Sequence, residues 1–162
     1  MPRGSQQTNI LPSLLDRLLD DEPGLSKEPA DRRFQNLREL ESAVARDVEA
    51  LLNTRQESLE ELPEFTEISR SLINYGLPDF TSFSLLNQDD RSRIRRAVEQ
   101  AIAAFEPRLE RVRVSLETPR ENDRGLRFRI EALLKVDPAP EPVSFDALLQ
   151  LHNQQYVVKG QG

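Results

Sequence analysis

A carboxylate and a guanidinium flank a proline in the stretch Phe105-Glu106-Pro107-Arg108-Leu109, FEPRL. Glu106 could act as a general acid, as in glycoside hydrolysis, or it could form an ion pair that holds a corner of the fold or contacts a partner. The stretch lies where a helical pattern of apolar residues stops and an alternating strand pattern starts. Because Pro107 disfavours helical angles at the residue before it, the helix is predicted to end at Glu106.

The surroundings of Glu106 favour an ion pair over an acid catalyst. Residues two apart in an extended segment project to the same side, so Arg108 is expected to favour the charged form of Glu106. Glycoside hydrolysis also requires a second carboxylate at a set distance, and no spacing among the 28 acidic residues singles one out. Whether the pair pins the corner locally, meets a partner, or does both stays open at this point.

The composition removes most other chemistry. The chain has no cysteine and one histidine, His152, which excludes disulfides, thiol chemistry and the usual zinc sites. It contains neither a glycine-rich phosphate loop nor a Ser/His/Asp order, and we expect no cofactor and no metal. A formal charge of −6 argues against nucleic-acid binding, and the basic run at 91–96, RSRIRR, is more typical of a solvated helix face.

With 162 residues the chain suits one domain and a tail. We expect an N-terminal arm with a linker over residues 1–30 and a single domain over residues 31–162. The N-terminal stretch has no long apolar run of the kind that marks a signal peptide or a membrane span, so the expected compartment is the cytoplasm.

The arm is predicted to contain one short amphipathic helix. Ser13 is suited to begin it, and Glu22-Pro23-Gly24 to end it. About ten residues are marginal as a helix alone in water, so its apolar face must dock either on the chain's own domain or on another protein. That face consists of Leu14, Leu15, Leu18 and Leu19.

Two longer helices are expected to position the corner. Apolar residues at steps of three and four predict a helix over 32–57 that ends near Asn53-Thr54, with Arg46 and Asp47 at the edge of its apolar stripe. A second helix is predicted over 91–105, after capping residues at 87–90. Between them, INYGLPDF at 73–80 predicts an apolar turn that packs onto the domain.

The period of the apolar residues changes to two after Arg108. Residues 109–118, 125–136 and 142–151 alternate between apolar and polar, and QQYVVK at 154–159 can form a last short strand. Helices followed by consecutive strands indicate an α+β fold, with two main helices packed on one face of a small antiparallel sheet and an N-terminal helical arm. As an unpaired edge, the last strand could accept a strand from a partner.

Three motifs occur in a recognisable order: SAVARDVEALLNTR at 42–55, INYGLPDF at 73–80, and FEPRL at 105–109. With PSLLDRLLD near the start, this arrangement resembles the TssE family of type VI secretion baseplate subunits, a phage-tail baseplate wedge family labelled lysozyme-like. The resemblance spans about residues 14–158. It matches Glu106, Pro107 and Arg108 to the family's signature triplet, and Arg46, Asp47 and Arg55 to its helix motif. Ala45 stands where many members are expected to carry a basic residue.

The resemblance implies a non-catalytic structural subunit of the baseplate, near the bacterial inner membrane. It would join the wedge partners TssF, TssG and TssK and help to initiate assembly of the TssB and TssC sheath. Two alternatives stay open: a peptidoglycan-cleaving, lysozyme-like hydrolase and a generic cytosolic adaptor. The implied partner-binding residues are Glu106, Pro107, Arg108, Arg46, Asp47, Leu14, Leu15, Leu18 and Leu19.

Overall fold

The computed structural model describes residues 10–19, 23–24, 35–56, 67, 71–84, 86–117, 125–150 and 155–160. Helices precede strands along this part of the chain, as the sequence predicts. The elements are α1 (Leu14–Leu18), α2 (Leu37–Asn53), the 3-10 helix η3 (Leu72–Asn74), α3 (Gln88–Phe105), β1 (Leu109–Leu116), β2 (Gly125–Leu134), β3 (Glu141–Gln150) and β4 (Gln155–Gly160). Apart from Gly24, the linker predicted after the arm helix lies outside the described residues, as does His152.

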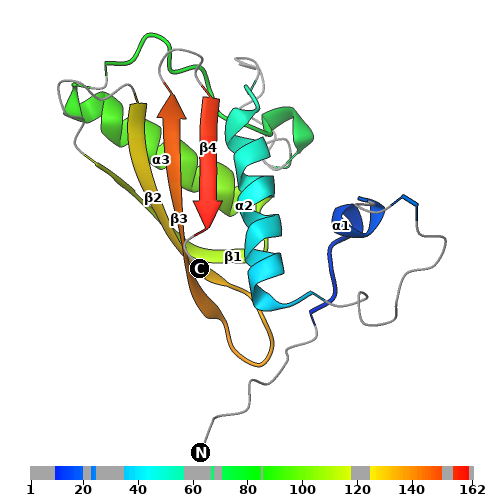
Figure 1. Ribbon diagram of the computed structural model, residues 1–162. Coiled ribbons are helices and arrows are strands. Elements are labelled where there is room, and N and C mark those ends of the chain that lie inside the picture. Colours follow the sequence, from blue (N-terminus) through cyan, green and yellow to red (C-terminus); the bar gives the residue numbers. More distant parts are fainter. Residues whose placement is uncertain are drawn as a thin grey trace, which may run out of the picture.

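The strands form an antiparallel sheet in the order β1-β2-β3-β4, with α2 and α3 on one face (Figure 1). Helix α3 contacts β1 and helix α2 contacts β4. The predicted α+β fold, with two main helices on one face of a small antiparallel sheet and a helix before them, is confirmed.

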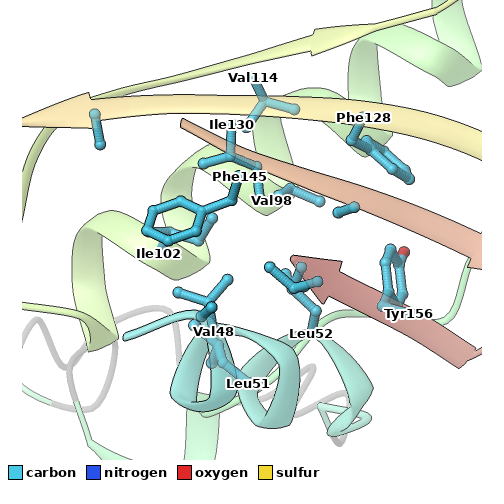
Figure 2. Packing of buried hydrophobic residues seen from close by; sticks show 14 of the residues in the cluster. Val48, Leu51, Leu52, Val98, Ile102, Val114, Phe128, Ile130, Phe145 and Tyr156 are labelled. Carbon is cyan, nitrogen blue, oxygen red and sulfur yellow. The ribbon is translucent and has the colours of Figure 1, made fainter. Parts of the chain in front are cut away.

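The core lies between the two helices and the sheet. Figure 2 shows Val48 and Leu51 of α2 and Ile102 of α3 directed toward Phe145 and Ile130 of the sheet. Full burial of such a side chain contributes about 1.5–3 kcal/mol. This apolar contact is what holds the two helices to the sheet and so fixes the corner at which α3 turns into β1.

Capping residues set the ends of the helices. Helix α2 begins at Leu37 rather than at residue 32, because Asn36 and Glu39 form a reciprocal capping box at its first turn. Its end at Asn53 and the end of α3 at Phe105 agree with the sequence prediction. Helix α1 has only five residues and ends before Leu19, so the stop predicted at Glu22-Pro23-Gly24 was placed too late.

Strand β1 contains a bulge that alternation did not predict. Arg111 has φ 54°, and the pairing with β2 shifts between Glu110 and Arg113. One extra residue in the strand allows both Leu109 and Val114 to face the core, although their odd separation would otherwise place them on opposite sides. The bulge therefore lets the first residue after the corner be buried.

Candidate functional site

The corner between α3 and β1 forms as the FEPRL motif predicts. Glu106 leaves the helical region, with φ −117° and ψ 81°, and its backbone N–H still donates to the carbonyl of Ile102 at 2.9 Å. Pro107 is exposed at the tip of the turn. Glu106 itself is 4% exposed. Among the described residues, it is the charged residue that is buried in the core.

Arg108 and Glu106 form a two-pronged ion pair. The Nε and Nη2 of Arg108 donate to Oε1 and Oε2 of Glu106, each at 2.6 Å, and the backbone N–H of Arg108 donates to Oε1 at 3.2 Å. This side-by-side geometry is the strongest that an arginine and a carboxylate can adopt. Hydrogen bonding to Glu106 is the largest influence on Arg108 and raises the pKa of its guanidinium further above its ordinary value.

Two residues of α2 extend this pair into a longer chain of charges. Arg108 Nη2 also donates to Asp47 Oδ2 at 2.6 Å, and Asp47 Oδ1 accepts from Arg46 Nε at 2.9 Å and Nη2 at 2.7 Å. Arg46 Nη2 in turn donates to Asp16 Oδ1 of α1 at 2.7 Å. We call the alternating series Asp16, Arg46, Asp47, Arg108 and Glu106 the charge network.

The charge network brings together four residues that the sequence singled out and one that it missed. Asp16 was not recognised because its partner, Arg46, is 30 residues away in the chain. The one local signal is its spacing from Ser13, since the two side chains form a capping box at the start of α1. Arg55 lies outside the network and faces Asp79 at 3.6 Å.

Helix α1 turns its polar side to the rest of the chain and its apolar side to solvent. The Asp16 side chain is 6% exposed, whereas Leu14 and Leu18 are 73% and 71% exposed. Burial opposes ionisation of Asp16, but hydrogen bonds from Ser13 and Arg46 outweigh it and lower the pKa of its carboxyl. The other two arm leucines, Leu15 and Leu19, are about half exposed.

The loop after η3 places Tyr75 beside the charge network. Its ring packs edge-on against Phe105, with ring centres 5.3 Å apart. Burial, followed by the negative charges of Asp47 and Glu106, raises the pKa of the Tyr75 hydroxyl.

The next residue, Gly76, packs against the end of α2. It has φ 111° and lies so close to the carbonyl of Thr54 that a β-carbon would collide with it. All three sequence motifs therefore meet around the corner.

A separate cavity of about 480 Å³ opens at the C-terminal end of α2. Its lining includes Leu52, Phe80 and Tyr156, together with the Arg55 and Asp79 pair. None of the described residues of the charge network lines it.

Within the described ranges, no helix is long and apolar enough to cross a bilayer, and no group of metal-ligating side chains is found.

Residues 38–139 match the family described as "Baseplate wedge protein gp25". The chain belongs to this baseplate wedge family. The match covers α2, η3, α3, β1 and β2, so both helices and the corner of the wedge fold lie inside it. The arm helix α1 and strands β3 and β4 lie outside the matched residues.

Comparison with solved structures finds a chain of "The baseplate complex from the type VI secretion system". It shares 20% sequence identity with this wedge-family chain, with a TM-score of 0.46, over 70% of this chain and 96% of that chain. No protein with a curated description matches.

Proposed function

We propose that this wedge-family chain is a non-catalytic structural subunit of a type VI secretion baseplate. It joins the wedge partners TssF, TssG and TssK and helps to start the TssB and TssC sheath, on the cytoplasmic side near the inner membrane. Family membership and the order of the three TssE-like motifs support this role. The observation that carries it is the charge network, which ties an arm with an uncovered apolar face to a rigid, charged corner.

The corner presents an accessible rim to a partner, around a buried arginine. Arg108 donates from Nε and Nη2, but its Nη1 is buried without an acceptor among the described residues. A buried donor without an acceptor costs about 1–3 kcal/mol, but Nη1 is closed to solvent, so another subunit does not reach it in this conformation. The exposed Pro107 and the partly exposed Arg46 form the accessible rim of this surface.

The arm supplies a second docking element. In the proposed division, residues 1–30 form the arm and residues 31–162 the wedge domain. A short amphipathic helix whose leucines face outward is suited to lie in an apolar groove of another subunit. Each leucine so buried would contribute about 1.5–3 kcal/mol.

The geometry supports a structural ion-pair role for Glu106 over acid catalysis. Both of its carboxylate oxygens accept hydrogen bonds from the Arg108 guanidinium, and it does not line the cavity. A general acid instead needs a protonated carboxyl that reaches a substrate. A glycoside hydrolase would also place its two carboxylates across a sugar-binding cleft.

Assembly tests this proposal directly. We expect Glu106→Ala and Arg108→Ala to yield folded proteins that fail to support contractile sheaths, counted by fluorescence of a labelled sheath subunit. Arg129→Ala is the matched control, because it removes an arginine from an exposed ion pair with Asp146 on the sheet. Normal sheath numbers in both corner variants would refute the partner role of the corner.

A second measurement addresses the hydrolase alternative. Purified protein incubated with peptidoglycan is expected to release no sugar fragments. Release that is abolished by Glu106→Gln would replace the structural proposal with a catalytic one.

A further inference from the structure

The outer edge of β4 is occupied by two side chains of α2. Asn53 Oδ1 accepts from the backbone N–H of Tyr156 at 2.7 Å, and Asn53 Nδ2 donates to the carbonyl of Tyr156 at 2.9 Å. Two residues further along the strand, the N–H of Val158 donates to Glu49 Oε2 at 2.8 Å. These are three of the backbone groups that an added strand would use, since alternate residues of an edge strand direct their peptide groups outward.

The spacing of α2 matches the spacing of β4. Four residues of a helix rise about 6 Å, and two residues of an antiparallel strand rise about 6.8 Å. Position 53 of α2 therefore lies opposite position 156 of β4, and position 49 lies opposite position 158. The primary amide of Asn53 has one carbonyl and donor hydrogens, as a peptide group has. It therefore makes the pair of hydrogen bonds that a residue of a fifth strand would make. Figure 1 shows α2 running alongside β4.

The opposite edge of the sheet is capped at one position and interrupted by a bulge. Glu99 Oε1 of α3 accepts from the backbone N–H of Val114 in β1 at 2.9 Å. The bulge at Arg111 disrupts the same strand closer to the corner. Side chains from covering helices and bulges are both means by which proteins prevent edge-to-edge pairing of sheets.

We infer that Glu49, Asn53 and Glu99 are edge-capping residues that prevent a second copy of this chain from adding a strand to the sheet. At β4, another strand gains access only when Glu49 and Asn53 leave the backbone. The last strand is therefore not the free edge that its sequence suggests. This role concerns the isolated chain, and it goes beyond the proposed baseplate function and does not depend on it.

Hydrogen exchange followed by NMR tests the caps in the wild-type protein. The amides of Tyr156 and Val158 are expected to exchange at least about tenfold more slowly than unbonded amides of an open edge. In Glu49→Ala/Asn53→Ala, both should lose about tenfold in protection while Ile130 in β2 stays protected. Glu49→Gln retains an oxygen acceptor and should keep Val158 protected. Glu41→Ala is the matched control, a glutamate two helical turns earlier on α2.

Self-association is the second readout. Sedimentation velocity at increasing concentration should show wild type and Glu41→Ala as monomers, and Glu49→Ala/Asn53→Ala as a dimer or larger species. Fast exchange of Tyr156 and Val158 in the wild type would overturn the inference, even if the double variant fails to fold. A folded double variant that exchanges faster but remains monomeric would also overturn it, because the edge would then need no caps.

Discussion

Arg108 is the residue on which the corner depends, because one guanidinium serves two carboxylates from different elements. It binds Glu106 at the end of α3 and Asp47 in the middle of α2. With 6% of its side chain exposed, Glu106 has little access to water that could replace this partner. Removing one member of such a buried pair costs more than the pair contributes, because the other charge is left uncompensated.

We predict that Arg108→Met lowers the free energy of unfolding by about 3 kcal/mol in urea titrations at neutral pH. The domain should stay folded, since typical domains have about 5–15 kcal/mol. The double variant Glu106→Gln/Arg108→Met should recover part of the loss, because no unpaired charge remains in it. If Arg108→Met alone is as stable as the wild type, the ion pair does not stabilise the corner.

At this scale, sequence reasoning found the local contact and missed the distant ones. Glu106 and Arg108 are two residues apart across a proline, so their pairing follows from backbone geometry alone. The contact between Arg108 and Asp47 joins residues 61 apart, and that between Arg46 and Asp16 joins residues 30 apart. The family resemblance singled out Asp47 but not its contact with Arg108, and the one local signal for Asp16 is its spacing from Ser13.

Among the elements, α1 meets α2 through the ion pair of Asp16 and Arg46. Just before α1, Ile10 pairs with Gln35 through two backbone hydrogen bonds, which also hold the arm to the domain. The hydrogen bonds from Ser13 and Arg46 lower the pKa of Asp16 from its ordinary value of 3.8. A carboxyl with a lowered pKa stabilises the attached state at pH values above that ordinary value. The stabilisation is lost as the pH falls through the lowered pKa, when Asp16 becomes protonated.

We therefore predict that α1 separates from α2 in acid, below about pH 3.8, before the sheet unfolds. Asp16→Asn should reproduce the separation at pH 7, with up to about a fivefold loss of amide protection in α1, since such pairs contribute about 1 kcal/mol or less. NMR hydrogen exchange measures both, with β2 amides as the internal control. An acid transition of α1 that persists unchanged in Asp16→Asn would assign it to another group.

The sequence locates some element boundaries and misses others. The ends of α2 and α3 follow from Asn53 and Pro107, which act on their immediate neighbours. The short length of α1 was missed because its leucine spacing continues to Leu19 although the helix has already ended. The bulge at Arg111 was missed because it requires a positive φ at a residue with a side chain, and only the burial of Leu109 on the same face as Val114 accounts for it.

For the whole molecule, the exposed leucines are distributed unevenly. Two helices cover the core, yet in the arm Leu14 and Leu18 are largely exposed, and Leu15 and Leu19 are about half exposed. Exposed leucines gathered in one short segment of a charged chain indicate a candidate interaction site. Leu72, Ile73 and Leu86 are also exposed outside the arm, so a test of the arm needs a control from the domain.

We predict that Leu14→Ala/Leu18→Ala leaves the free energy of unfolding within about 0.5 kcal/mol of wild type, because both side chains are exposed. The same variant should weaken binding to co-expressed wedge subunits by about a hundredfold, since burial of each leucine contributes about 1.5 kcal/mol or more. Leu72→Ala is the matched control, because Leu72 is 84% exposed but lies in η3. The affinities of the wild type, the arm variant and the control are measured by titration against the purified wedge subunits. If the control weakens binding as much as the arm variant does, the arm is not the specific docking element, and if neither does, the apolar face serves another purpose.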